Sequence, residues 1–376
     1  MGNSNWEYYS LGDLTENFDS FRVPIKETNR KKGQYPYYGA SGIIDMVDGY
    51  LFDGEYLLVA EDGENLKSRK TPIAFMASGK FWVNNHAHII RGNEKADTRF
   101  LMYFLGQADI SGFLTGSTLP KLTQDNLNRI PVLLPPLPEQ RAIAGILGAL
   151  DDKIELNRRM NRTLESIARA VFRQWFVESE EVGSWKVGKF GEISEIRRDS
   201  INPGLFPDEI FNHYSIPAYD ETRFPAHESG NQIKSNKFII SDRCVLISKL
   251  NPEIQRIWLP LTLEGRSICS TEFLVNVPKG CFTPEFLYGL FYSQSFQDRF
   301  VSMTTGTSGS HQRVKAEYVL DMEVELPPEN LVAAYTEMVK PMLKKVQQNI
   351  LESRTLASLR DSLLPKLMRG EVRVRG

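Results

Sequence analysis

A Leu-Pro-Pro signal followed by a long helical pattern occurs twice in this chain, and this repeat constrains the fold more than any other feature. The signals end at Pro135-Pro136 and Pro327-Pro328, so the shift is 327 − 135 = 192 residues. The same shift, without a gap, aligns Asn157 with Asn349. Self-similarity at one fixed shift is the signature of internal duplication. We therefore predict a tandem repeat of one globular-plus-helix unit.

A second echo lies at the start of each half. The stretch WEYYSLGDLTE begins at Trp6, and WKVGKFGEISE begins at Trp185. Trp, Gly, an acid, an aliphatic residue and a final Glu recur at the same spacing. A chain of 376 residues is long enough for two domains, which fits two repeats.

Composition places the chain among ordinary globular proteins, with 41% hydrophobic and 24% charged residues. No run of about 18 apolar residues occurs, so we expect no membrane span. The three cysteines lack CxxC spacing, and we expect reduced thiols in a cytoplasmic protein. The formal net charge is −2, so any basic surface must be local.

Each half begins with a region that reads as short strands broken by turns. In the first region, 1–136, YLFDGEYLLVA carries an Asp-Gly turn signal and a helix is expected from about Thr98. The second region, about 180–327, repeats this texture. There TPEFLYGLFYSQSFQDRF predicts one helix. The fold class expected is α+β.

A heptad pattern of apolar residues follows each Pro-Pro. Steps of four and three residues from Ile143 to Trp175 meet eight apolar positions in ten, and the positions 192 later meet seven. The first helix should span roughly 139–177. Pro341 should kink the second helix or delay its regular start. We predict that the two helices pair as a coiled coil.

Two polar positions interrupt these seams. An Asn in an apolar seam costs stability and fixes register, which is the role predicted for Asn157 and Asn349. If the repeats are related by a two-fold axis, the helices run antiparallel and these equivalent residues face each other. The alternative is two solvated asparagines on a loose seam.

Enzyme signatures are missing from the sequence. It has no G-x-x-x-x-G-K-[ST] phosphate loop, and its Asn-Pro pairs do not match the Asn-Pro-Pro-aromatic motif of adenine methyltransferases. His86 and His88 could hold a metal, but no Cys or carboxylate cluster near them in the sequence supports that. We expect no catalytic residues, cofactor or metal.

Polar, basic loops remain as candidate sites. Lys and Ser suit the phosphates of duplex DNA, while Arg, Asn and Gln suit base edges. Each loop alone could be plain solvated surface, but similar loops precede the second Pro-Pro and the first. The candidate DNA-binding residues are Lys67, Arg69, Lys70, Ser117, Lys121, Lys249, Asn251, Gln255, Arg256, Ser310, His311 and Arg313.

The helical segments also carry a family resemblance. LLPPLPEQRAIAGILGALDDKIELNRRMNRTLESIARAVFRQWF resembles the first conserved region of specificity subunits of Type I restriction–modification systems. LRDSLLPKLMRGEVRV is similar to the second conserved region. YPYYGASGIIDMVDGYLFDGEYLLVAEDG resembles a common version of the target recognition domain. The second half departs from the family pattern, because PENLVAA replaces the PLPEQ that follows the first Pro-Pro.

The resemblance implies a non-catalytic subunit that reads a bipartite, asymmetric DNA target. It implies two target recognition domains separated by two long helices that form an antiparallel coiled coil. The expected boundaries are a first recognition domain at 1–136, a spacer helix at 137–178, a second recognition domain at 179–327, and a spacer helix with tail at 328–376. DNA adenine methyltransferase subunits would dock on the helices, and restriction/translocase subunits would join the full complex.

Two other readings stay open. The chain could be the specificity subunit of a two-subunit nuclease–methyltransferase outside Type I. It could also be a scaffold that binds protein or RNA through its paired domains without reading sequence.

Overall fold

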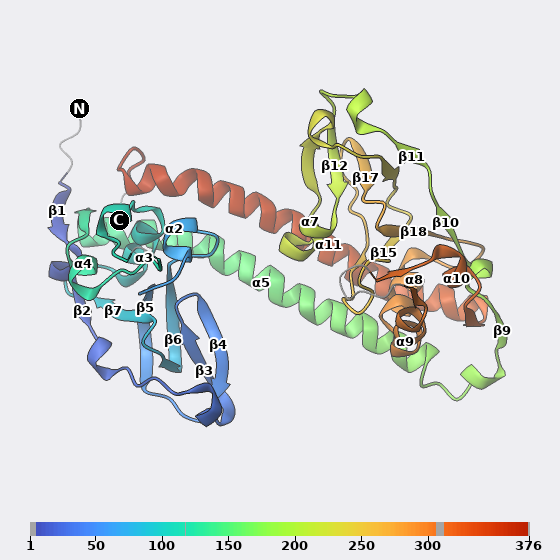
Figure 1. Ribbon diagram of the computed structural model, residues 1–376, viewed down its shortest axis with the longest axis horizontal. Coiled ribbons are helices and arrows are strands. Elements are labelled where there is room, and N and C mark those ends of the chain that lie inside the picture. The colour runs from blue at the N-terminus through green and yellow to red at the C-terminus, as the bar shows by residue number, and fades with distance from the viewer. Residues whose placement is uncertain (1–4, 117, 306–311, 375–376) are drawn as a thin grey trace. The chain divides into compact units, whose positions relative to one another are not determined.

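The computed structural model describes residues 5–116, 118–305 and 312–374 (Figure 1). The chain divides into two compact units: unit 1 is Met1–Glu155 with Arg354–Gly376, and unit 2 is Leu156–Ser353. Helices α5 (Leu137–Phe176) and α11 (Glu329–Met368) each contribute one part to each unit.

Unit 1 is built on a sheet with the strand order β2-β7-β5-β6-β3-β4. These strands are β2 (Thr15–Asn17), β3 (Lys32–Gly39), β4 (Gly42–Val47), β5 (Phe52–Ala60), β6 (Ala74–Val83) and β7 (Ala87–Gly92). A separate antiparallel pair joins β1 (Glu7–Ser10) to β8 (Pro131–Leu134). The helices of this region are α1 (Leu11–Leu14), α2 (Asn65–Ser68), α3 (Thr98–Gln107) and α4 (Gln124–Asn128). The core joins Leu57 and Phe100 to Leu147 of α5 and Leu367 of α11.

Unit 2 contains sheets with the orders β10-β18-β15-β16 and β11-β14-β17-β12-β13. The first has β10 (Ser194–Arg197), β15 (Val245–Ser248), β16 (Ile257–Trp258) and β18 (Phe273–Pro278). The second has β11 (Ser200–Ile201), β12 (Ile210–Tyr214), β13 (Ala226–Ser229), β14 (Lys237–Ile239) and β17 (Arg266–Cys269). Short pairs join β9 (Lys186–Lys189) to β21 (Glu323–Leu326) and β19 (Thr304–Thr305) to β20 (Arg313–Val314). The helices are α6 (Phe190–Ile193), α7 (Ile216–Thr222), α8 (Pro284–Tyr292), α9 (Gln294–Ser302) and α10 (Ala316–Leu320).

Both sequence echoes fall on corresponding strands. The run β1-α1-β2 begins at Glu7 and the run β9-α6-β10 at Lys186, a shift of 186 − 7 = 179 residues. Their partners β8 and β21 begin at Pro131 and Glu323, a shift of 323 − 131 = 192. In each unit the strand after the early Trp pairs with the strand before Leu-Pro-Pro. The repeated sequence signals therefore mark the same local structure twice.

The long helices have nearly the predicted bounds. Helix α5 spans 137–176, and α11 begins at Glu329, so Pro341 does not delay its start. The predicted seam is fully buried at Ile143 and Tyr335. Toward the end of α5, however, Phe172 is more deeply buried than the predicted seam residues on either side of it, because its ring packs on Tyr335 at 5.6 Å between centroids.

Within each unit, the segments of α5 and α11 are joined by polar contacts. In unit 2 the Asn157 amide donates to Glu352 at 2.8 Å, and the Asn349 amide donates to Asn161 at 2.8 Å. The predicted asparagines are thus both fully buried, but the hydrogen bonds of each go to other residues. In unit 1 Arg360 donates to Asp151 at 2.6 Å.

Two local predictions were wrong. Asp53-Gly54 lies inside β5 and not in a turn, because Gly54, at φ 137°, pairs with Gly79 of β6. The helix expected over TPEFLYGLFYSQSFQDRF is two helices, because Ser293 is extended between them and its hydroxyl caps α9. None of the helices in the described ranges is long and apolar enough to cross a membrane.

Candidate nucleic-acid interface

In unit 1 the structure brings together two of the basic segments selected from the sequence. Residues 61–70 follow β5, and residues 118–122 precede α4; we call them the first loop pair. The Leu122 amide donates to the Glu61 carbonyl at 2.8 Å, and the Gly63 amide donates to the Pro120 carbonyl at 3.1 Å. These bonds fix the loops side by side, although about fifty residues of chain separate them.

Unit 2 joins its two selected segments in the same way. Residues 249–256 follow β15, and residues 312–315 precede α10; we call them the second loop pair. The Val314 amide donates to the Lys249 carbonyl at 3.1 Å, and the Asn251 amide donates to the Gln312 carbonyl at 3.0 Å.

The two loop pairs are structurally equivalent. The bond from Leu122 to Glu61 corresponds to the bond from Val314 to Lys249, with shifts of 314 − 122 = 192 and 249 − 61 = 188 residues. The bond from Gly63 to Pro120 corresponds, at the same two shifts, to the bond from Asn251 to Gln312. A third bond also recurs, from the Glu61 amide to the His86 carbonyl and from the Lys249 amide to the Glu272 carbonyl. The frame is shared, but the side chains on it differ: Glu61 stands where the second pair has Lys249. The same backbone arrangement therefore carries different side chains in the two units.

The basic side chains of the first loop pair divide into exposed groups and an anchor. Lys67 and Lys70 are exposed, and the half-exposed Lys121 contacts Glu61 at 3.2 Å. Arg69 caps α2 in a left-handed conformation, at φ 50°. Its guanidinium donates to the carbonyl of Ala108 at 2.7 Å, which fastens the loop to the end of α3.

The second loop pair borders a hollow of about 430 Å³ lined by four cations: Arg198, Lys249, Arg313 and Lys315. Arg313 donates to both carboxylate oxygens of Glu272, at 3.0 and 3.1 Å. Arg198 donates to Glu317 at 2.6 Å, and this pair lowers the pKa of the Glu317 carboxyl. The sequence had not marked Arg198, because it lies over a hundred residues from Arg313 in the chain.

The remaining candidates of the second pair differ in exposure. Gln255 is exposed and Asn251, at φ 47°, is half-buried. Arg256 is 8% exposed and donates to both oxygens of Asp220, at 2.7 and 2.8 Å. Arg256 therefore ties the loop to α7. Ser117, Ser310 and His311 lie outside the described residues.

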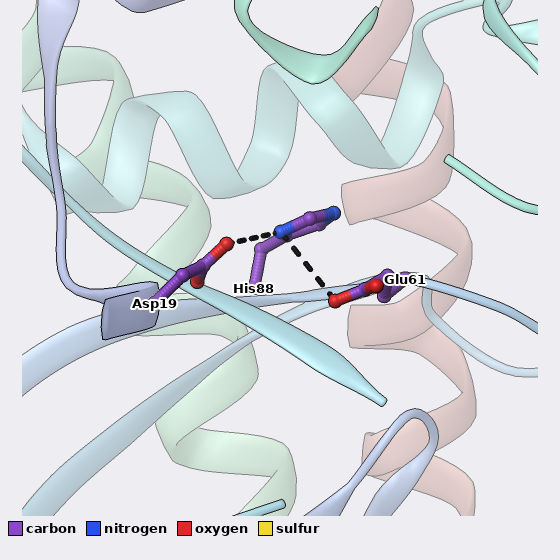
Figure 2. Close-up of side chains that lie close together, drawn as sticks. All are labelled: Asp19, Glu61 and His88. Atoms are coloured by element: carbon purple, nitrogen blue, oxygen red, sulfur yellow. Dashed lines mark hydrogen bonds and ion pairs between the residues drawn. The ribbon is translucent and has the colours of Figure 1, made fainter. Parts of the chain in front are cut away.

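A cluster of buried polar side chains contacts the first loop pair. Asp19, Glu61 and His88 place ligand-type atoms within 4.8 Å of one another (Figure 2). His88 Nδ1 lies 2.5 Å from the Asp19 carboxylate, and its Nε2 lies 2.8 Å from the Leu122 carbonyl. Both ring nitrogens therefore face oxygen atoms that can accept a hydrogen bond.

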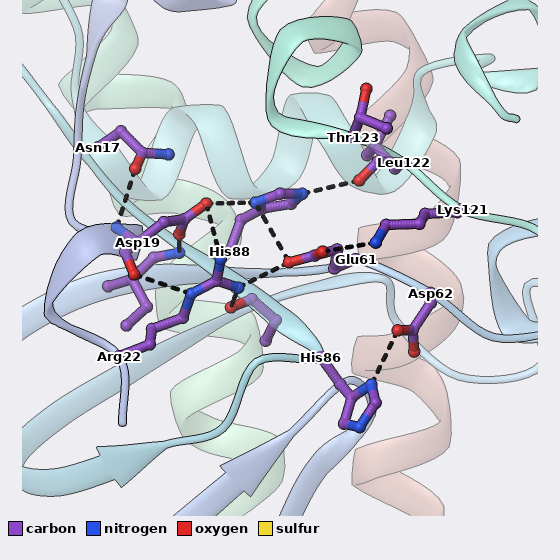
Figure 3. A network of polar contacts seen from close by, with 12 residues as sticks. Asn17, Asp19, Arg22, Glu61, Asp62, His86, His88, Lys121, Leu122 and Thr123 are labelled. Atoms are coloured by element: carbon purple, nitrogen blue, oxygen red, sulfur yellow. Dashed lines mark hydrogen bonds and ion pairs between the residues drawn. The ribbon is translucent and has the colours of Figure 1, made fainter. Parts of the chain in front are cut away.

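Cations of the protein already balance this cluster (Figure 3). Arg22 donates to Glu61 at 2.7 Å, and Lys121 reaches the other Glu61 oxygen. Burial alone would raise the pKa of Glu61, but the Arg22 hydrogen bond and the neighbouring positive charges outweigh it and hold that pKa below its ordinary value. The contacts fit a structural ion network better than a metal site, and the exposed His86 pairs separately with Asp62 at 2.8 Å.

Comparisons with known proteins identify relatives of this chain. Residues 3–166 match the family described as Type I restriction modification DNA specificity domain. The MjaIX specificity subunit of Methanocaldococcus jannaschii, a Type I restriction enzyme subunit, is 22% identical over 98% of this chain and 94% of its own length. The Type I HindI specificity subunit of Haemophilus influenzae is also 22% identical, over 98% of this chain and all of its own. The family match covers the first part of the chain, and relatives named as Type I specificity subunits align along nearly all of it.

The other similarities are partial in sequence or concern the fold. A further Haemophilus influenzae relative is 41% identical over 147 residues, which is 39% of this chain and 38% of that relative. The crystal structure of the Type I S subunit from Mycoplasma genitalium matches with a TM-score of 0.69 and 16% identity, over 98% of this chain and 97% of that one. The family predicted from the helical motifs is therefore confirmed, and the fold is shared along the whole chain.

Proposed function

We propose that this chain is the non-catalytic DNA-recognition subunit of a Type I restriction–modification complex. Each loop pair reads one half of a bipartite duplex target. The observation that carries this proposal is the recurrence of the same three backbone bonds in both units, under different side chains. Because the frames agree and the side chains differ, the two half-sites differ in sequence and the target is asymmetric.

The side chains take separate roles by their exposure. The exposed Lys67 and Lys70 suit phosphates, because a mobile ammonium needs no fixed geometry. Lys121 is a further phosphate candidate, half-exposed and held beside Glu61. Gln255 suits a base edge. The remaining direct candidates are Ser117, Lys249, Asn251, Ser310, His311 and Arg313. Arg69 and Arg256 hold the loops in shape, since their guanidinium groups fasten the loops to α3 and α7. Arg313 stays a direct candidate because its side chain is 41% exposed although it pairs with Glu272.

The recognition domains are 1–136 and 179–327, and the segments 137–178 and 328–376 form an antiparallel coiled coil between them. In unit 2, Asn157 of α5 bonds to Ser353 of α11, and Asn161, four residues later in α5, bonds to Asn349, four residues earlier in α11. This opposite order supports the antiparallel direction. DNA adenine methyltransferase subunits dock on these helices, and restriction/translocase subunits complete the complex. The buried asparagines fix the register.

The test is a map of methylated bases in cells that carry this chain with its methyltransferase partner. The expected result is one motif of two unlike halves separated by unspecified bases. A single uninterrupted motif would contradict two readers on a spacer. Absence of any methylation that depends on this chain, together with no salt-dependent DNA binding by the assembled complex, would favour a scaffold.

Replacement of loop lysines tests whether the first loop pair contacts the DNA backbone. A variant carrying Lys67→Ala and Lys70→Ala should weaken binding to all duplexes while keeping the motif, because phosphate contacts carry no sequence information. The matched control replaces Lys26 and Lys32, which are exposed lysines of unit 1 outside the loop pair. Equal effects of both double variants would mean that the loop is not a preferred contact.

A further inference from the structure

A basic groove in unit 2 shares no lining residue with the second loop pair. Its volume is about 880 Å³, and part of its wall is the second half of α5. The far wall includes the end of α7 and the junction of α8 and α9, and Val346 and Ile350 of α11 also line it. Its charged lining is Arg158, Arg162, Glu165, Arg169, Arg173 and Arg223. Five cations face one carboxylate there, although the whole chain has a net charge of −2.

Glu165 is the one carboxylate in this lining, and Arg173 also contacts Glu178, outside the lining, at 3.2 Å. Glu165 contacts Arg169 and Arg223, each at 3.5 Å, which is long for a strong ion pair. Arg169 also stacks over the Tyr292 ring at 3.6 Å from the centroid, which holds its guanidinium plane in place. The Nε of Arg169 is buried and has no hydrogen-bond partner among the described atoms. The stacked guanidinium of Arg169 therefore keeps a fixed orientation in the groove wall.

The four arginines on α5 lie along one face of the helix. Their spacings of four, seven and four residues keep successive side chains on the same side. From Arg158 to Arg173 the helix rises about 22 Å. This length corresponds to roughly six or seven base pairs of duplex at about 3.4 Å each.

The groove is continuous with the second loop pair through one short helix. On α7, Asp220 holds Arg256 of the loop pair, and Arg223 caps the same helix and lines the groove. The Tyr219 hydroxyl further donates to the carbonyl of Gln255 at 3.4 Å. Helix α7 therefore joins the second loop pair to the groove.

We infer that this arginine groove binds backbone phosphates of duplex DNA beside the half-site read by unit 2. The inference rests on the proposed function and adds a second, sequence-independent contact surface to it. Continuity with the reading loop favours DNA over an acidic protein partner as the occupant. Since phosphate contacts carry no base information, the groove would bind the backbone beside the unspecified bases without adding to the motif.

The test measures binding of the assembled complex with its methyltransferase to a labelled 30-base-pair duplex, across a range of salt concentrations. Any duplex sequence serves, because each phosphate contact contributes about 0.9 to the slope of log K against log salt. The variant Arg162→Gln with Arg173→Gln should lower the slope by about two units. Arg223→Gln, on the opposite wall, should lower it by about one unit. The methylated motif should be unchanged in both.

The control is Arg159→Gln, which removes the same charge from an exposed position on the same helix outside the groove. It should leave the slope unchanged. If the groove variants keep the wild-type slope, the inference is wrong while the proposed function stands. If they instead weaken assembly with the methyltransferase in the absence of DNA and keep the slope, the occupant is a protein. A wild-type complex that binds no DNA would overturn both the inference and the proposed function.

Discussion

Gln140 is expected to stabilise the start of α5. It is fully buried and makes three side-chain hydrogen bonds. Its Oε1 accepts from the Asp97 amide at 2.8 Å, and its Nε2 donates to the carbonyls of Lys95 and Pro135 at 2.9 and 2.8 Å. Asp97 caps α3, so this one amide ties α5 to α3 and to the end of β8.

We predict that Gln140→Ala lowers the free energy of unfolding of unit 1 by about 3 kcal/mol. The estimate takes about 1 kcal/mol for each of three buried bonds. Such a loss is a large part of a typical total of about 5–15 kcal/mol. Gln140→Glu should cost at least as much, because a carboxylate oxygen would then face two carbonyl oxygens that can only accept.

The assay is urea unfolding, with hydrogen exchange of the Asp97 amide as the local measurement. The comparison variant is Gln347→Ala, because the half-buried Gln347 donates one bond, to the Pro260 carbonyl at 3.0 Å. It should cost about 1 kcal/mol. Equal losses for both alanine variants would refute the reasoning, since the cost would then not follow the number of buried bonds.

Three further outcomes follow from the contacts. The pKa values of Asp19 and Glu61 are held low. The stability that these carboxylates contribute is therefore complete above the ordinary carboxyl pKa of about 4 and is lost as the pH falls below it. Asp19→Asn should flatten that loss when urea unfolding is measured at each pH. Matched seven-residue insertions after Glu155 and Ser353 lengthen both helices by about 10 Å. They should widen the gap in the methylated motif by about three base pairs, and an unchanged gap with full methylation would show that the helices do not set the spacing. Exchange of 179–327 for the equivalent domain of a relative should change one half of the motif, and a change in both halves would contradict modular reading.

The sequence by itself determined the features that depend on near neighbours and on repetition. The helix bounds could be predicted because each turn buries residues three or four apart, and this period is visible in the letters. The shift of 192 aligned the strands before Leu-Pro-Pro, and the echo at Trp6 and Trp185 aligned the strands that pair with them. The Asp53-Gly54 signal was also physically real, since Gly54 has a positive φ, but it lies within a strand.

Tertiary structure decided which distant groups meet. Nothing near Lys121 in the sequence indicates that its loop rests on Glu61 and His88, or that Arg198 joins Arg313 at one hollow. Both seam asparagines are buried, and their partners depend on how the helices pack. A hydrogen bond needs about 3 Å between its atoms, and that distance is set by the packing of the whole unit and not by the local pattern.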